Sequence, residues 1–473
     1  MVRAPCAHVL TTVALLTPAA AEAHAFGARY DLPIPLGAFL AAAAAAVALS
    51  FLGAGILLKR ESARTIGVDL RLPRFAMRAG HLTLRAVGIG VLLLVLTTGF
   101  FGPQNATHNF ATIAVWVLWW VGFLLFSALV IGLWHLADPL RSLHAGLDRL
   151  RGSPGQLAVL PAAAGWLAPA GLLAIAWLEL VSDLSEWPAA LAALIGLYCL
   201  VTLAGAARYG CRWFETADPL SRIFALLARM APVELREKAV LRLRPPAEGL
   251  LDAPRDRAGE TTLVIFLISM VLFDGLSETP LWAGLLDAIS QSQTLRGGLL
   301  VLRDAGVDLM KLIRSIGLFG TVAAFLGFYF AIALLMRAAA GGEFRTAEVA
   351  AVMAGALLPI AVAYHLSHYI SYLAIAGQLA IPAASDPFGL GWNLFGGANR
   401  VIDIGVIGAE QVWWVAVTAL VAGHALSVVL AHRLALRFFA TRRQALKALV
   451  PMTVAMIGLT VLSLWILAQP IVA

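Results

Sequence analysis

The chain has 473 residues, of which 61% are hydrophobic and only 13% are charged, and its mean hydropathy is +0.86. Soluble domains carry about 25% charged residues, so this composition argues against a soluble enzyme, a nucleic-acid-binding protein and a disordered scaffold. The net charge of +7 needs no acidic partner if the basic residues mark one side of a membrane. We therefore predict an all-α fold, a polytopic bundle of transmembrane helices.

The first 23 residues have the pattern of a secretory signal peptide. A short basic start is followed by an apolar run and by small residues at the cleavage position, Ala21 and Ala23. An uncleaved first span is the alternative. Cleavage would leave His24 as the mature N-terminus, where its amine and imidazole could both bind a metal. We predict a signal peptide over residues 1–23 and a single membrane domain over residues 24–473.

Ten later stretches are apolar enough to cross a membrane, which takes about 20 residues. They cover residues 34–58, 86–102, 111–136, 159–182, 187–207, 261–280, 309–337, 346–379, 405–432 and 448–470. If the mature N-terminus lies outside, the five inner loops are 59–85, 137–158, 208–260, 337–347 and 433–447. These loops hold 27 of the 34 Lys and Arg residues, and the outer segments hold six. This asymmetry follows the positive-inside rule and predicts both termini outside.

One short motif occurs twice. Residues 134–140, which include Asp138-Pro139, recur as residues 214–220, which include Asp218-Pro219. An aspartate followed by proline suits a helix N-cap and first helical position. We predict two capped helices, the second an amphipathic helix lying on the inner surface.

The longer loops show less pattern. Residues 208–260 have too little apolar periodicity for a core of their own, and residues 281–308 favour an interfacial helix and turn. The glycine- and aromatic-rich residues 385–397 are typical either of a loop that lines a cavity or of a plain surface loop.

Acidic side chains in the span 261–280 are the first indication of function, because an ionisable group in hydrocarbon needs an inward face and a partner. Asp274 and Glu278 are four residues apart and share a face, with Ser277 beside them. Two carboxylates on one stripe imply a shared proton or a cation. Alternatively, Glu278 lies at the membrane interface and only Asp274 is buried. We predict Asp274, Glu278 and Ser277 as the catalytic group.

Histidines in two later spans are the second indication. His365 and His368 are one turn apart, and Tyr372 continues their face. Metal ligation, a hydrogen-bonded pair and haem ligation all remain open for the two histidines. His424 lies near the middle of its span. The predicted metal ligands are His365, His368, Asp274, Glu278 and His424. Such ligands suit zinc, manganese, iron or copper, and the residues do not decide among these divalent metals.

Two more features bear on the spans. Pro359, six residues before His365, predicts a kink that opens the helix backbone to a cavity. Glu179, Asp183 and Glu186 predict a solvated acidic rim at the outer end of the fourth span, with Glu179 pointing inward.

Several stretches together resemble bacterial polytopic membrane proteins labelled fenitrothion hydrolase. They are His24-Ala25-Phe26-Gly27-Ala28-Arg29-Tyr30-Asp31-Leu32-Pro33-Ile34-Pro35-Leu36, Phe273-Asp274-Gly275-Leu276-Ser277-Glu278-Thr279, Ala363-Tyr364-His365-Leu366-Ser367-His368-Tyr369 and Ser385-Asp386-Pro387-Phe388-Gly389. The resemblance covers nearly the whole chain and brings no assigned catalytic residues with it.

This resemblance implies a membrane-bound organophosphorus hydrolase in the bacterial inner membrane. Such an enzyme cleaves an apolar aryl phosphotriester or phosphorothioate to a phenol and a dialkyl acid, and metal-bound hydroxide suits that reaction. The expected partners are membrane lipid and an apolar small-molecule ester, with no nucleic acid, and protein partners stay open.

Two other classes of function fit the same residues. A transporter or metal-handling protein would use intramembrane Asp, Glu and His as a proton or cation path. A bis-His haem protein would pair His365 or His368 with His424. The chain has no Walker-type GK[ST], no GxSxG and no GxGxxG motif.

Overall fold

The computed structural model describes residues 34–58, 67–151, 158–236, 239–252 and 257–469. The predicted signal peptide, His24 and most of the first block of the family resemblance lie outside these residues.

The described residues form an all-α bundle with ten helices long and apolar enough to cross a membrane, as predicted. Some spans combine consecutive helical segments. The spans are α1 (Leu36–Leu57), α2 (Arg74–Phe101), α3–η1–α4 (Phe110–Leu129), η2–α7 (Ala162–Leu180), α8 (Pro188–Tyr209), α11 (Arg257–Ser277), α14 (Leu309–Ala339), α15–α17 (Thr346–Ser385), α18 (Ala409–Phe438) and α19 (Arg442–Leu467).

Several span boundaries differ from the sequence prediction, two of them by seven residues or more. The second helix begins at Arg74 rather than residue 86, directly after Pro73. At 28 residues it is about 42 Å long, more than the ~30 Å hydrocarbon core, so its polar first turns can project beyond the apolar layer. The third span ends at Leu129 rather than residue 136, because Ile131 instead forms a parallel bridge with Val233.

Two spans lie at the centre of the bundle. In α11, 89% of the apolar window is buried, and in α15–α17 the share is 83%, against 17% in α1 and in α2. Glycines let the central helices approach each other closely. A Cβ at Gly275 of α11 would lie 2.7 Å from the Tyr364 hydroxyl oxygen of α16 (Leu358–Ala376), and one at Gly423 of α18 would lie 2.4 Å from the Ala363 Cβ. Both glycines bring neighbouring helices against the segment that carries His365 and His368.

The central span is broken close to the predicted kink. Helix α15 (Thr346–Ala354) is followed by a 3₁₀ turn over Gly355–Leu357, and α16 then starts with Pro359 in its first turn. Proline fits the first turn of a helix because no backbone N–H is needed there. The interruption therefore precedes the proline.

The duplicated motif folds into two units that pack against each other reciprocally. Asp138 accepts hydrogen bonds from the backbone N–H of Leu140 and Arg141 at the start of α6 (Pro139–Arg151), and Asp218 caps α10 (Pro219–Ala228) through the Ser221 N–H. Both predicted caps are confirmed.

Aromatic contacts join the two copies of the motif, because a ring of each copy packs on the helix of the other. Trp134 of the first copy lies with its ring centroid 4.9 Å from that of Phe224, and Phe214 of the second lies 6.0 Å from His144. Trp134 corresponds to Phe214 and His144 to Phe224 at the 80-residue offset, so each copy packs its ring on the helix of the other. Seven of the ten residues of α10 are buried, so its apolar face is covered by protein. Its location at the inner membrane surface stays a prediction.

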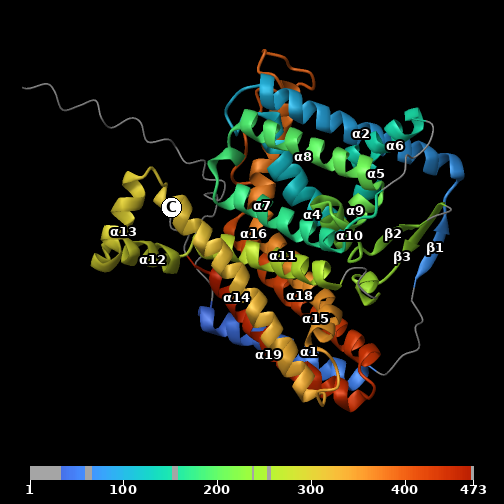
Figure 1. Cartoon of the computed structure of the whole chain (residues 1–473), viewed down its shortest axis with the longest axis vertical. Coiled ribbons are helices and arrows are strands. Elements are labelled where there is room, and N and C mark those ends of the chain that lie inside the picture. The colour runs from blue at the N-terminus through green and yellow to red at the C-terminus, as the bar shows by residue number, and fades with distance from the viewer. Residues whose placement is uncertain (1–33, 59–66, 152–157, 237–238, 253–256, 470–473) are drawn as a thin grey trace, which may run out of the picture.

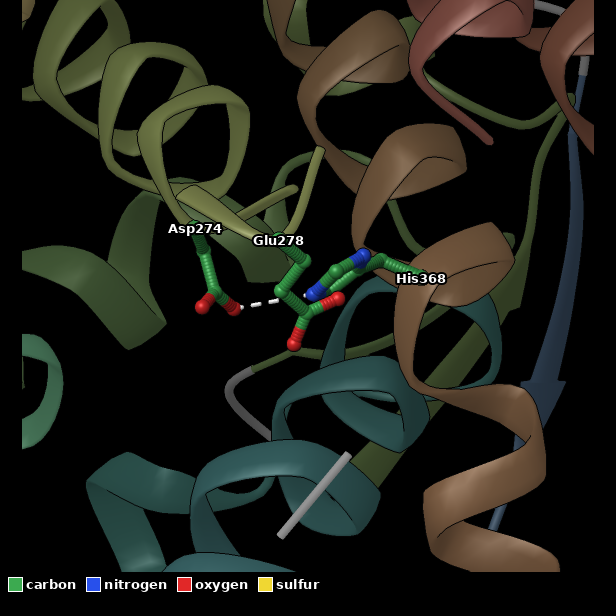
Figure 2. A group of neighbouring side chains, drawn as sticks. All are labelled: Asp274, Glu278 and His368. Atoms are coloured by element: carbon green, nitrogen blue, oxygen red, sulfur yellow. Dashed lines mark hydrogen bonds and ion pairs between the residues drawn. The ribbon is translucent and has the colours of Figure 1, made fainter. Parts of the chain in front are cut away.

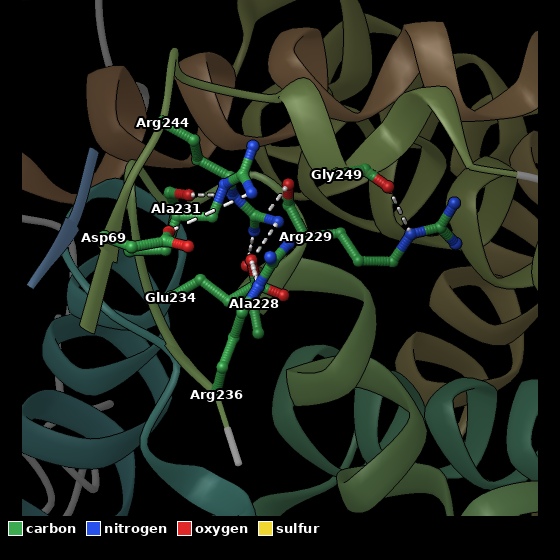
Figure 3. A network of polar contacts seen from close by, with 9 residues as sticks. Asp69, Ala228, Arg229, Ala231, Glu234, Arg236, Arg244 and Gly249 are labelled. Atoms are coloured by element: carbon green, nitrogen blue, oxygen red, sulfur yellow. Dashed lines mark hydrogen bonds and ion pairs between the residues drawn. The ribbon is translucent and has the colours of Figure 1, made fainter. Parts of the chain in front are cut away.

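A small antiparallel sheet was not predicted. Its strands are β1 (Val68–Arg71), β2 (Val233–Arg236) and β3 (Val240–Leu243), in the order β1-β3-β2. Arg244 donates to the carbonyls of Ala231 and Ala228 and forms an ion pair with Glu234 at 3.3 Å (Figure 3). These contacts lie within the segment 208–260. The pairing of β3 with β1 and a hydrogen bond of 3.1 Å from Arg437 of α18 to the Leu251 carbonyl tie the segment to the rest of the bundle, so the prediction that it has no separate core is consistent with the fold.

The glycine-rich loop is largely a surface feature. Leu390, Leu394 and Phe395 are 66%, 58% and 75% exposed. The sequence left open whether residues 385–397 line a cavity or form a plain surface loop. The exposure of these three side chains favours the surface loop.

Candidate functional site

The central span α11 supplies the two carboxylates of the candidate site. Asp274 lies in the last turns of the helix and is 4% exposed. Glu278 lies in the turn directly after Ser277 and is half-buried. The helix ends here because Pro280, the first residue of α12 (Pro280–Gln291), disfavours a helical conformation at Thr279. Glu278 is thus at the end of the span, as the alternative interpretation anticipated.

His368 of α16 faces these carboxylates from the neighbouring helix. Its Nε2 donates to Asp274 Oδ2 at 2.9 Å. One ligand atom each from Asp274, Glu278 and His368 lies within 4.8 Å of the other two. Figure 2 shows the three side chains converging between α11 and α16. The predicted ligands Asp274 and His368 thus meet inside the bundle, with side chains that are 5% and 7% exposed.

Two more hydroxyls surround Asp274. Tyr369 donates a hydrogen bond to the same Oδ2 atom that His368 contacts. Ser277 instead donates to the backbone carbonyl of Asp274, at 2.8 Å. The Tyr369 contact fixes the carboxylate in one orientation, which is the usual task of a residue that supports a metal ligand. The role of Ser277 in catalysis stays a prediction.

The other two predicted ligands do not join this group in the described part of the chain. His365 packs its ring 4.7 Å from that of Tyr369, and its buried Nε2 has no hydrogen-bond partner. His424 is fully buried, and its Nδ1 donates to the Leu420 carbonyl at 2.8 Å. Histidines three residues apart on a helix project about 60° apart, so one can face α11 while the other does not. Metal ligation by His365 and His424 stays a prediction.

A third carboxylate lies near the site on α7 (Leu167–Leu180). Glu179 accepts a hydrogen bond from Trp120 Nε1 at 2.8 Å and interacts electrostatically with Asp274 and His368. Its inward direction was predicted. Asp183 and Glu186 are exposed as the rim expected there, and Asp183 pairs with Lys311 of α14 at 2.6 Å.

The geometry suits a metal ion with open coordination positions. Two ligands about 2.1 Å from one ion lie about 3 Å apart in an octahedral site and about 3.4 Å apart in a tetrahedral one. The His368 Nε2 and Asp274 Oδ2 atoms are separated by 2.9 Å, which is close to the octahedral value. Their present hydrogen bond requires a proton that metal binding would displace. Three protein ligands leave room for water or substrate, as catalytic zinc sites do.

The fold and site define a class but no family. The chain is a multi-pass membrane protein with a carboxylate–imidazole group inside its helix bundle. It matches no protein-family model, no curated protein and no solved structure.

Proposed function

We propose that this protein is a metal-dependent hydrolase of the membrane, acting on apolar organophosphorus esters such as fenitrothion. The observation that carries the proposal is the convergence of Asp274, Glu278 and His368, whose ligand atoms lie within 4.8 Å of one another. Ionisable side chains inside a membrane bundle are costly, and they usually have a partner or a function. The residues that resemble fenitrothion hydrolases include all three of these side chains.

In the proposed reaction, water adds to phosphorus, the bond from phosphorus to the aryl oxygen breaks, and the products are a phenol and a dialkyl acid. A divalent metal held by the three side chains would supply hydroxide near neutral pH. Tyr369 would keep the Asp274 carboxylate oriented toward the ion. Glu278, being half-buried at the end of the span, would lie nearest to an ester arriving from the lipid.

Release of the nitrophenol from an aryl phosphotriester tests the hydrolase. Protein in lipid nanodiscs is treated with chelator and then given zinc, manganese, iron or copper. We expect one of these metals to restore turnover in the wild type, and Glu278→Gln and His368→Gln to lose most of it. The matched control is Glu410→Gln, a change of the same type at an exposed position of α18, and it should keep full turnover.

Full turnover in Glu278→Gln and His368→Gln would contradict the proposed site. Binding of metal by the wild type without any hydrolysis would contradict the hydrolase and favour the metal-handling class of function.

We also propose a location in the bacterial inner membrane with both termini outside. The support is the distribution of Lys and Arg, 27 in the proposed inner loops and six in the outer segments. Reporter fusions after residues 150 and 245 should read as cytoplasmic, and a fusion after residue 395 should read as exported. A cytoplasmic signal at residue 395 would overturn this orientation.

A further inference from the structure

Two helices outside the spans form a hairpin beside the candidate site. Helix α12 begins two residues after Glu278, and α13 (Gln293–Asp304) follows it and leads into α14. Thr279, Ser292 and Asp308 cap the three helices in turn. Because α11 and α14 both cross the membrane, the hairpin must begin and end at one membrane surface. Figure 1 shows α12 and α13 extending sideways, away from the rest of the bundle.

The bundle holds only the start of this hairpin. Trp282 of α12 is buried, and its ring meets that of Phe273 edge to face at 5.5 Å. Gly317 of α14 makes room for this contact, since a Cβ there would lie 2.4 Å from the Trp282 ring. Helix α13, in contrast, has no buried side chain.

The uncovered helix is amphipathic. Leu295, Leu299 and Leu302 follow the i, i+4, i+7 spacing of one helical stripe. Leu295 and Leu302 are 49% and 38% exposed, and Leu299 between them is half-buried. Arg296 and Arg303 are seven residues apart and form the adjacent stripe. An apolar stripe flanked by basic residues is typical of helices that lie in the interface of a bilayer.

We propose that the α12–α13 hairpin docks on the bilayer surface, with the leucine stripe of α13 in the acyl region and Arg296 and Arg303 at anionic lipid phosphates. The spans α11 and α14 at its two ends place the hairpin at the bilayer surface, and the charge of its arginines complements lipid phosphate. Both observations favour lipid over a second copy of the chain as the partner. The inference depends on the chain spanning a membrane and does not depend on the proposed hydrolase activity.

Labels at two positions of α13 test this docking in the full chain. Cys6, Cys199 and Cys211 are first replaced by alanine, and a nitroxide is then attached to Leu299→Cys or to Gly297→Cys. These two positions lie about 200° apart around the helix, and a side chain at Gly297 meets open space within the chain. In vesicles that contain anionic lipid, we expect the label at 299 to lie about 5–10 Å below the phosphates, with several-fold lower accessibility to a water-soluble nickel quencher than the label at 297.

The basic stripe gives a second measurement. The Arg296→Gln, Arg303→Gln double variant should raise the accessibility of the label at 299 in anionic vesicles to the value found in neutral vesicles. Equal accessibility of both labels in anionic vesicles would overturn the proposal. So would protection of position 299 accompanied by spin–spin broadening, because that result would mean that a second copy covers the stripe.

Discussion

Asp274→Ala should lower the free energy of unfolding by about 2–5 kcal/mol, because removing one member of a buried, charge-assisted hydrogen-bonded pair leaves its partners poorly solvated. The Asp274 carboxylate accepts from His368 of the neighbouring helix and from Tyr369, and the residue is 4% exposed. It is thus a polar connection between α11 and α16 inside the bundle. Unfolding of the purified protein in detergent micelles, followed by circular dichroism, measures the loss.

Asp287→Ala is the matched control, since Asp287 is exposed on α12 and such surface changes usually stay within about 0.5 kcal/mol. In addition, Asp274→Ala and Tyr369→Phe should be non-additive, because the two residues share one hydrogen bond. Equal stability of the Asp274→Ala and Asp287→Ala variants would mean that the hydrogen bonds of Asp274 contribute nothing to the free energy of unfolding.

Asp138→Asn should remove a pH dependence of stability that arises outside the membrane spans. Burial raises the pKa of Asp138 to about 6, and the nearby Asp218 carboxylate adds to the shift. Burial also raises the pKa of Asp218, which Tyr198 and Ser221 contact.

The sign of the effect follows from the raised pKa in the folded protein. An unfolded aspartate titrates near pH 4, so the stability contributed by Asp138 is fully present below about pH 4 and is lost as the pH rises through about 6. A shift of roughly two pKa units corresponds to about 3 kcal/mol. Asparagine keeps the Oδ1 atom that caps α6 and removes the titrating proton.

Unfolding free energies of the wild type and Asp138→Asn between about pH 4 and pH 8 check this expectation. The wild type should lose stability over this range, and the variant should lose much less. Asp304→Asn, at a side chain that is 67% exposed, should behave as the wild type does. The same pH slope in the wild type and in Asp138→Asn would show that Asp138 does not control it.

The spans could be predicted from the sequence because each depends on a local property, an apolar run of sufficient length. The caps at Asp138 and Asp218 were local in the same way, since a cap is formed by residues two or three positions away. The sheet was missed because β1 pairs with a strand far along the chain: Val68 pairs with Leu243 of β3, 175 residues later. A four-residue strand is too short for its sequence pattern to indicate a partner so far along the chain.

The site was predictable to the extent that helical spacing determines it. Asp274, Glu278 and His368 could be proposed because ionisable groups in apolar spans are conspicuous. Spacing alone could not separate His368 from His365, because that choice depends on the rotation of α16 against α11, which Gly275 and Gly423 help to set. The Tyr369 contact and the Trp120–Glu179 bond also depend on how helices distant in sequence pack.

Metal content of the purified protein tests the central claim most directly. After loading with zinc, manganese, iron or copper and removal of free ion, elemental analysis should find one ion of the preferred metal bound per wild-type and per Glu410→Gln chain. Glu278→Gln and His368→Gln should retain far less, while their circular dichroism stays that of a folded helical protein. Equal metal content in the wild type and in these two folded variants, or no binding of any of the four metals by the wild type, would contradict a metal site at Asp274, Glu278 and His368.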